Sequence, residues 1–502
     1  MKGKQRGIGI LLNYLNEGVK ILTALVYTPL MLRLLGQQEY GLYQLAVSVV
    51  SYLGLLNLGF GSGYVRSYAR LQVKGDQAGI ARLNGMFLLI FGFLGGISLL
   101  SGGVLICHAE TVLGKGLKPE ELEKAKSLLG ILTGNLALTL INSLFDSHIT
   151  AREQFLLQKL LRLAQSLFGP FLTFPLLLMG YGAEAVVLVS LTLTAAVLIC
   201  NIYCCRKRLK MEFCFQDLQF SELRELWSFT FFVFLNQIID QANWNVDKLL
   251  LGRMRGTAAV AVYGVGAQIY SMYMQLSIAV SGEFQPKVNR LAAQSGDTRE
   301  LSRLMAQVGR IQALVLMPVL TGFLFWGREF LKLWAGEDYR EAYLVALLLM
   351  VPATIPLIQN LVIEFQRARN RHRVRSVVYA CLAAGNVILS IGWIRRWGCT
   401  GAAAGTAVTL VLGNVLFMNW YYQKRLKLDM ELFWKEIGRL VPVWVLAGLF
   451  GGVLSAAVTV TTWGELMTVL GLYSGGYGLA VLVLAQKRTG DRKTPVPGGV
   501  KR

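Results

Sequence analysis

The chain is dominated by apolar runs of about 20 residues that contain no Asp, Glu, Lys or Arg. A run of this length can cross the hydrocarbon core of a bilayer as one helix. Two further stretches, about 7–32 and about 227–251, are also long and apolar enough to span, but they carry charges in their interior. We therefore predict an all-α polytopic membrane protein with 14 transmembrane helices. The uncharged runs are residues 40–65, 83–107, 127–145, 163–183, 185–205, 256–282, 311–327, 342–363, 376–394, 397–423, 440–464 and 466–486.

The composition excludes a soluble enzyme. Hydrophobic residues make up 54% of the chain and charged residues only 16%, compared with roughly 25% charged residues in a soluble globular protein. The net charge of +21 does not indicate a nucleic acid partner. The basic residues lie in short clusters between apolar runs, without the basic patch interleaved with aromatic residues that such a partner requires.

Lys and Arg residues are distributed unevenly between the two sides of the predicted membrane. With the N-terminus inside, the cytoplasmic segments carry 36 of them and the opposite segments carry 12. Cytoplasmic loops of membrane proteins are enriched in Lys and Arg, so we predict that both termini are cytoplasmic. The basic clusters then face the anionic lipids of the inner leaflet, which makes membrane lipids a predicted partner.

Short motifs recur in the same order at an offset of 216 to 221 residues. Leu34-Leu35-Gly36 recurs at 250–252, and the sequence KRLK at 207–210 recurs at 424–427. Because the offset spans six predicted helices, an even number, the two copies have the same orientation. We predict two six-helix lobes, residues 1–215 and 216–430, related by a parallel repeat. Two extra C-terminal helices in residues 431–486 and a basic cytoplasmic tail, 487–502, lie outside it.

Two predicted helices that are equivalent in this repeat, the first and the seventh, are the ones with charges in mid-span. In each, polar residues recur every three or four positions, which places them along one stripe of a helix. The stripe on the first helix contains Asn13, Asn16, Glu17 and Lys20, and that on the seventh contains Asn236, Asp240, Asn243, Asp247 and Lys248.

These stripes allow two interpretations. A charge facing lipid costs about 2.5–3.5 kcal/mol near the bilayer centre, so both stripes must face protein or water. They can line a water-filled cavity between the lobes, which would make them substrate-binding residues. Alternatively, they hold helices together, with Glu17 and Lys20 neutralising each other, or Lys248 extends to the headgroups. Three other ionisable residues, Asp146, His148 and Glu364, come at predicted helix ends and are interpreted as membrane-interface residues.

Several motifs resemble the polysaccharide-biosynthesis flippases of the multidrug/oligosaccharidyl-lipid/polysaccharide exporter superfamily. The resemblance covers about residues 8–430. In the first half it lies in PLMLRLLG at 29–36 with EYGLY at 39–43, and in LNLGFG at 56–61 with Arg66. In the second half it lies in DKLLLG at 247–252 with Val262 and Tyr263.

The resemblance implies a V-shaped pair of six-helix lobes in the cytoplasmic membrane of a prokaryote. By alternating access, they would move an undecaprenyl-diphosphate-linked oligosaccharide to the outer leaflet for cell-surface polysaccharide synthesis. By this resemblance the chain would be a transporter rather than an enzyme, without a cofactor and with other polysaccharide assembly proteins as further partners. Lys20 is the candidate for holding the diphosphate. Asp240 and Asp247 would carry H⁺ or Na⁺ as the coupling ion.

The sequence departs from the lipid II branch of these flippases, whose cavity carries several arginines, because the second helix here has no charge. Another lipid-linked glycan is therefore the expected cargo. Two alternatives remain. An ion-coupled multidrug antiporter of the same superfamily would use the same carboxylates for cationic drugs. A membrane glycosyltransferase or polymerase would need catalytic groups in a long outer loop, and the one candidate loop, residues 108–126, has the mixed charges of a solvated segment.

Overall fold

The computed structural model describes residues 2–114, 117–216, 234, 237–238, 241, 244–293, 298–368 and 373–491, and side chains are described for most of these. Within these ranges the chain is helical and contains no strand. This agrees with the predicted all-α fold, since a backbone in hydrocarbon must satisfy its own hydrogen bonds.

The chain divides into two compact units. Unit 1 comprises Met1–Gly264 and Ser376–Thr406, and unit 2 comprises Val265–Arg375 and Ala407–Arg502. These bounds, which come from packing, do not coincide with the end of the first predicted lobe at residue 215. Two long helices, α9 (Thr257–Gly282) and α14 (Arg373–Leu410), contribute residues to both units.

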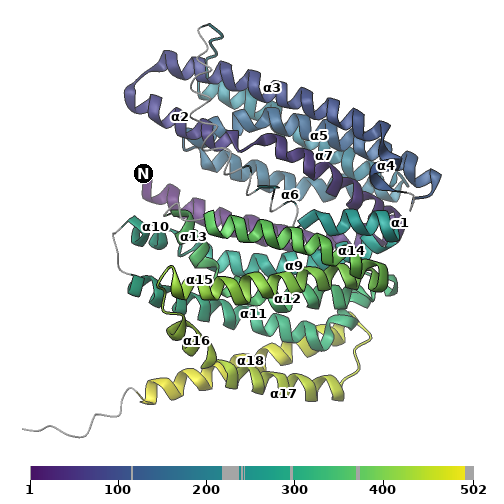
Figure 1. The fold of residues 1–502 in the computed structure, drawn as a ribbon, viewed down its shortest axis with the longest axis vertical. Coiled ribbons are helices and arrows are strands. Elements are labelled where there is room, and N and C mark those ends of the chain that lie inside the picture. The colour runs from purple at the N-terminus through teal and green to yellow at the C-terminus, as the bar shows by residue number, and fades with distance from the viewer. Residues whose placement is uncertain are drawn as a thin grey trace, which may run out of the picture. The chain divides into compact units, whose positions relative to one another are not determined.

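Unit 1 is built around α5, which contacts α1, α2, α3, α6 and α7 (Figure 1). Its core contains aromatic side chains of α2 and α3, with the rings of Tyr64 and Phe87 packed edge to face at 5.2 Å. Residues 244–255 form a further helical segment. The elements of unit 1 are α1 (Lys2–Leu53), η1 (Gly54–Asn57), α2 (Phe60–Lys74), α3 (Gln77–Cys107), α4 (Ala109–Leu113), α5 (Pro119–Ala151), α6 (Phe155–Leu178), α7 (Gly182–Tyr203) and η2 (Cys204–Arg208).

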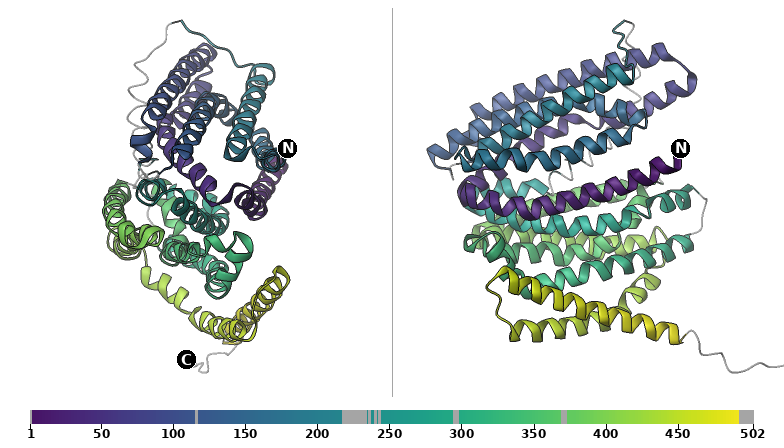
Figure 2. Two further views of the ribbon diagram at one scale, coloured as in Figure 1. Left: turned by 90° about the vertical axis from the view of Figure 1, so that its right-hand side faces the viewer. Right: turned by 180° about the vertical axis from the view of Figure 1, so that it is seen from behind.

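Unit 2 is centred on α11, which contacts α12, α16, α17 and α18. The last two helices lie side by side in both views of Figure 2, and Tyr473 of α18 packs against Trp326 of α11. The elements of unit 2 are α10 (Gln285–Ala293), α11 (Thr298–Trp334), η3 (Glu337–Tyr339), α12 (Ala342–Ile358), α13 (Asn360–Ala368), η4 (Val411–Met418), α15 (Asn419–Lys424), α16 (Met430–Gly438), α17 (Val441–Ala457) and α18 (Trp463–Asp491).

The two longest helices each contain a break at a glycine. Gly36 interrupts α1 with φ 73° and ψ 170°, and Gly398 interrupts α14 with φ 58° and ψ −132°. Glycine adopts positive φ without the steric cost of a Cβ. Each label therefore covers two helical segments, and the break in α14 lies just inside the predicted run 397–423.

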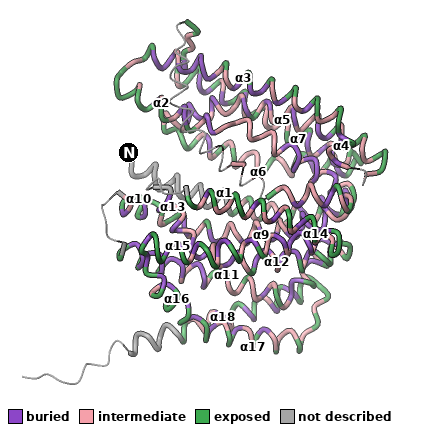
Figure 3. The backbone as a smooth tube through the Cα atoms, in the orientation of Figure 1, coloured by how far each residue is buried: buried purple, intermediate pink, exposed green. Residues whose placement is uncertain are grey.

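Exposed residues occur along whole helices and not only at their ends (Figure 3), and many of them are large and apolar. On α3, for example, Phe93, Leu100 and Val104 are exposed. By length and composition, nine helical stretches of the described chain can cross a membrane, or ten if the bent pair Ala342–Ile358 and Asn360–Gln366 forms one span. The fold is that of a multi-pass membrane protein whose outer surface is suited to lipid.

Candidate functional site

The predicted stripe on the first helix lies on α1. The side chains of Asn13, Asn16 and Glu17 lie outside the described residues. Lys20 is exposed on the part of α1 that can span a membrane, and α1 contacts α5 and α6 of the same unit. The structure therefore positions one cation of this stripe at a surface of unit 1, and its role in binding stays a prediction.

The predicted stripe on the seventh helix is described only over its last turn. Asn236, Asp240 and Asn243 lie outside the described residues. Lys248 is partly buried, and its Nζ donates to Oε1 of Gln44 on α1 at 3.1 Å. The Gln44 amide in turn donates to the hydroxyl of Tyr40 at 2.7 Å. Lys248 is thus bonded to an amide of α1.

Asp247 is the centre of a sealed polar cluster and is only 1% exposed. Ser390 donates to its Oδ1 at 2.8 Å. Tyr263 and Thr406 donate to its Oδ2 at 2.8 and 2.7 Å. The Oδ1 of Asn386 lies 3.2 Å from the Ser390 hydroxyl and 3.4 Å from that of Thr406. We call these five residues the Asp247 cluster.

The break at Gly398 makes the Asp247 cluster possible. Ser390 and Thr406 both belong to α14, and in a straight helix they would be about 24 Å apart at 1.5 Å per residue. Gly398 lies between them and lets the second segment of α14 return beside the first, so that both hydroxyls reach one carboxylate. No local sequence signal connects these residues to Asp247, which is 143 and 159 residues away.

The Asp247 cluster has the donor set of a hard cation. Carboxylate and carbonyl oxygens are the protein ligands that such ions prefer, and the cluster brings together the oxygens of Asp247, Asn386 and three hydroxyls. Over the described part of the chain, His, Cys, Asp and Glu residues do not gather in groups of three or more that would hold a transition metal. A monovalent cation or a proton fits the cluster better.

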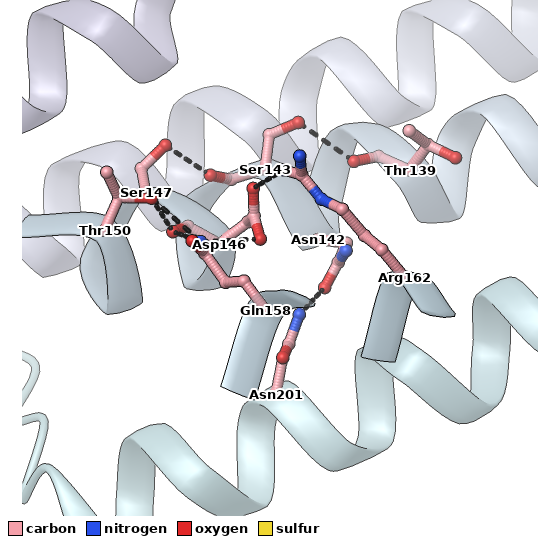
Figure 4. A network of polar contacts seen from close by, with 9 residues as sticks. All are labelled: Thr139, Asn142, Ser143, Asp146, Ser147, Thr150, Gln158, Arg162 and Asn201. Carbon is pink, nitrogen blue, oxygen red and sulfur yellow. Dashed lines mark hydrogen bonds and ion pairs between the residues drawn. The ribbon is translucent and has the colours of Figure 1, made fainter. Parts of the chain in front are cut away.

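A second polar network connects α5, α6 and α7 (Figure 4). Gln158 of α6 donates to the backbone oxygen of Asp146 at 2.7 Å, to its Oδ1 at 2.8 Å and to Thr150 Oγ1 at 2.8 Å. Arg162, one turn further along α6, lies 3.5 Å from Asp146 Oδ2. Unlike Asp247, both members of this ion pair are open to solvent, with side-chain exposures of 60% for Arg162 and 36% for Asp146.

The same face of α5 continues with amides and hydroxyls. Asn201 of α7 donates to Asn142 at 2.9 Å, and Asn135 donates to Ser190 of α7 at 3.1 Å. Thr139 and Ser143 donate to backbone oxygens of α5 one turn earlier, which leaves their hydroxyl oxygens able to accept. We call this set, together with Asp146, Thr150, Gln158 and Arg162, the α5–α7 network. Both α5 and α7 are long and apolar enough to cross a membrane, so the network forms a polar track along two candidate spans.

His148, which the sequence analysis interpreted as a membrane-interface residue, is completely buried within unit 1. Its Nδ1 is 2.7 Å from the hydroxyl of Tyr64, which donates to Asn84 at 2.6 Å, and Asn84 donates to the Glu212 backbone oxygen at 2.7 Å. The packing of α2 on α5 encloses the imidazole. Asp146 was also interpreted from its sequence as a membrane-interface residue. That interpretation did not include its contacts with Gln158 and Arg162 in the α5–α7 network.

Comparison with known proteins identifies the family of this chain and solved structures that share its fold. Residues 30–344, more than half of the chain, match the family of polysaccharide biosynthesis proteins. A protein of Shigella flexneri named "Putative O-antigen transporter" is 19% identical over 422 residues, which cover 82% of this chain and 96% of that protein.

Two solved structures share the fold. The lipid II flippase MurJ in an inward closed conformation has a TM-score of 0.75 at 12% identity, covering 96% of this chain and 99% of MurJ. The Vibrio cholerae MATE transporter VcmN has a TM-score of 0.60 at 16% identity, covering 85% of this chain and 98% of VcmN.

Proposed function

Because the chain belongs to the family of polysaccharide biosynthesis proteins, we propose that it moves a lipid-linked oligosaccharide across the cytoplasmic membrane by alternating access. The relative named as an O-antigen transporter supports this cargo class, because the similarity extends over nearly its whole length. The chain is a membrane transporter in polysaccharide biosynthesis and not an enzyme. The glycan is made and attached elsewhere, and other polysaccharide assembly proteins are proposed partners.

The observation that carries the proposal is the α5–α7 network. A sugar headgroup crosses hydrocarbon only where amides and hydroxyls replace its water, because an unpaired polar group costs several kcal/mol in an apolar medium. The network supplies such groups from Asn135 to Arg162 along helices of membrane-spanning length. The lipid tail can stay in the bilayer beside the exposed apolar surfaces.

We further propose the full count of 14 spans. The bent pair brings the nine candidate stretches to ten, and two of the nine, Gly18–Lys74 and Val374–Lys424, are 57 and 51 residues long and contain the breaks at Gly36 and Gly398. Each is long enough for two crossings at about 20 residues per span. The 26-residue α9 and the predicted span at 227–251 supply the last two. Both termini would then be cytoplasmic.

The backbone supports the proposed repeat of lobes 1–215 and 216–430. The recurring KRLK motifs both end in a lysine with positive φ, 49° at Lys210 and 53° at Lys427. Leu209 N donates to Cys204 O at 3.1 Å and Leu426 N to Tyr421 O at 3.2 Å, so the same bond recurs at an offset of 217 residues. The same sequence, the same backbone bond and a similar positive φ at one offset favour two copies of one structural unit.

Two roles from the sequence remain proposals for this transporter. Asp247 would carry the coupling ion, H⁺ or Na⁺, because its cluster offers oxygen ligands without a described cationic partner. Lys20 would bind the diphosphate. Lys20→Ala should abolish glycan export in a folded protein, and Lys20→Arg should retain part of it. Normal export by the double variant Glu17→Ala with Lys20→Ala would show instead that the two residues pair structurally.

A test of the whole function follows from the cargo. Deleting the gene in its source organism should remove surface polysaccharide and leave the lipid-linked oligosaccharide in the cytoplasmic leaflet, and re-expression should reverse both changes. The second candidate, a multidrug antiporter, is favoured by the shared fold with the MATE transporter, at the lower TM-score of 0.60. Unchanged surface polysaccharide together with lost efflux of a fluorescent cationic drug would support the antiporter.

A further inference from the structure

In the ion pair of the α5–α7 network, Arg162 is held loosely, whereas Asp146 is fixed by further hydrogen bonds. Arg162 lies seven residues after the start of α6, about 10 Å along the helix. Its guanidinium is 60% exposed and 3.5 Å from Asp146 Oδ2, longer than the roughly 2.7–2.9 Å of a strong charge-assisted hydrogen bond. The Arg162 guanidinium therefore points toward Asp146 but remains accessible to another anion.

Asp146 keeps a partner when Arg162 turns away. Gln158 is only 8% exposed and fixes Asp146 through both the backbone oxygen and Oδ1. Thr150 fixes the same amide at 2.8 Å. Loss of the guanidinium therefore removes the interaction at Oδ2 and leaves the hydrogen bond from Gln158 to Oδ1. An anion that reaches Arg162 can replace Asp146 Oδ2 without dismantling the rest of the network.

The chemistry around Arg162 selects for a phosphate-bearing lipid with a glycan. A guanidinium binds phosphate oxygens in a bidentate arrangement, which a neutral sugar does not offer. Beyond the ion pair, the same face of α5 presents Ser143, Asn142 and Thr139, all uncharged. A ligand with an anionic group at one end and hydroxyl groups beyond it would place the anion at Arg162 and the hydroxyl groups along the uncharged residues of α5.

We propose that Arg162 binds the diphosphate of the lipid carrier by exchanging it for the Asp146 carboxylate, which later competes for the guanidinium and releases the cargo. The inference rests on the proposed function. It adds to Lys20 a second cation, on a different helix. Asp146 prevents the diphosphate from being held too tightly, since transport requires a site that the cargo can leave.

The test is binding of undecaprenyl diphosphate, without a glycan, to the full chain in nanodiscs. Arg162→Ala should weaken binding at least tenfold, about 1.4 kcal/mol, and Arg162→Lys should weaken it less. Asp146→Asn should keep the bond from Gln158, free Arg162 and tighten binding several-fold. With undecaprenyl monophosphate as the ligand, the difference in affinity between the wild type and Arg162→Ala should be smaller. Arg396→Ala, a change at an exposed arginine of the same unit outside the network, should bind as the wild type does.

Three outcomes decide the matter. Equal binding by wild type and Arg162→Ala, in proteins with equal unfolding midpoints, overturns the role of Arg162 while leaving the transport function intact. Weaker binding by both Arg162→Ala and Asp146→Asn shows that the pair is a structural contact and also overturns it. Absence of diphosphate binding to the wild type, with binding of a cationic drug, contradicts the proposed function itself.

Discussion

Asp146 and Asp247 are both aspartates on helices of unit 1, yet their surroundings differ in almost every respect. Asp146 is 36% exposed and shares its carboxylate between one buried amide and one exposed guanidinium. Asp247 is 1% exposed and accepts from three hydroxyls. The charge of Asp146 is compensated by a side chain that can move. The described partners of Asp247 are three uncharged hydroxyls, which is the setting proposed above for a coupling ion.

The difference separates two tasks that one transporter needs. An open ion pair suits a large anionic ligand that comes and goes, because solvent and cargo reach it. A closed cluster of oxygens suits a small ion, because four helical segments fix its geometry and leave little room for a larger ligand. The following predictions test this division, from the largest expected effect to the smallest.

Removing each carboxylate should affect stability very differently. Asp247→Ala removes the carboxylate that accepts three hydrogen bonds from hydroxyls, and each such bond contributes about 0.5–1.5 kcal/mol, so a loss of about 3 kcal/mol is expected. Asp146→Ala breaks an exposed ion pair worth about 0–1 kcal/mol. Unfolding midpoints of the purified proteins in one detergent measure both. Similar shifts for the two variants would show that the hydrogen bonds of Asp247 stabilise the protein no more than the ion pair of Asp146 does.

Cation binding should stabilise the protein through Asp247 and not through Asp146. An ion present at ten times its Kd stabilises the folded state by about 1.4 kcal/mol. Adding Na⁺ in place of a large organic cation, or lowering the pH, should raise the unfolding midpoint of the wild type. Asp247→Asn should abolish this response, whereas Asp146→Asn should retain it. The effective condition identifies the coupling ion, and a full response in Asp247→Asn would refute the assignment.

Single hydroxyl changes should give intermediate effects. Ser390→Ala and Thr406→Val each remove one oxygen from the Asp247 cluster, and a typical hydrogen bond contributes about 0.5–1.5 kcal/mol. Each should raise the cation concentration needed for half-maximal stabilisation by about two- to tenfold. Ser143→Ala, a matched change in the α5–α7 network, should leave that concentration unchanged. A shift caused by Ser143→Ala would mean that the two sites are coupled.

Disrupting an amide pair of the open network should have the smallest effect on stability. Asn142 and Asn201 join α5 to α7 by one described bond at 2.9 Å. Asn201→Ala should lower stability by less than about 1 kcal/mol, because the Asn142 oxygen that loses its donor is partly exposed and can bond to water instead. Its effect should appear instead in glycan export at low cargo levels. A loss of stability as large as that of Asp247→Ala would assign the network a structural role.

The sequence predicted the helices well and their ends poorly, for a physical reason. A charge ends an apolar run but does not end a helix. The run beginning at residue 163 is part of α6, which starts at Phe155, and the run ending at residue 145 is part of α5, which continues to Ala151. Asp146 and Arg162 therefore fell outside the predicted spans, although both lie in the helices.

The sequence analysis identified charged residues within the spans but overlooked neutral polar residues. Asn135, Thr139, Asn142 and Asp146 recur at steps of four, three and four, which is the signal for a stripe on α5. Asp247 was found because it is charged. Ser390 and Thr406 were not, because a single hydroxyl in an apolar run has no distinctive pattern, and the turn at Gly398 that brings them together depends on tertiary structure.

The discontinuity of unit 1 has a consequence for how the protein is made. Thr406 is synthesised 159 residues after Asp247, which takes about 10–30 s at roughly 5–20 residues per second. During that interval the helix that carries Asp247 has left the ribosome, while two of the three hydroxyls that will bond its carboxylate do not yet exist. The insertion machinery must hold this helix out of bulk lipid, or accept it in neutral form, until the second segment of α14 arrives. Unit 1 is thus the first to begin folding but can be completed only when four fifths of the chain has been translated.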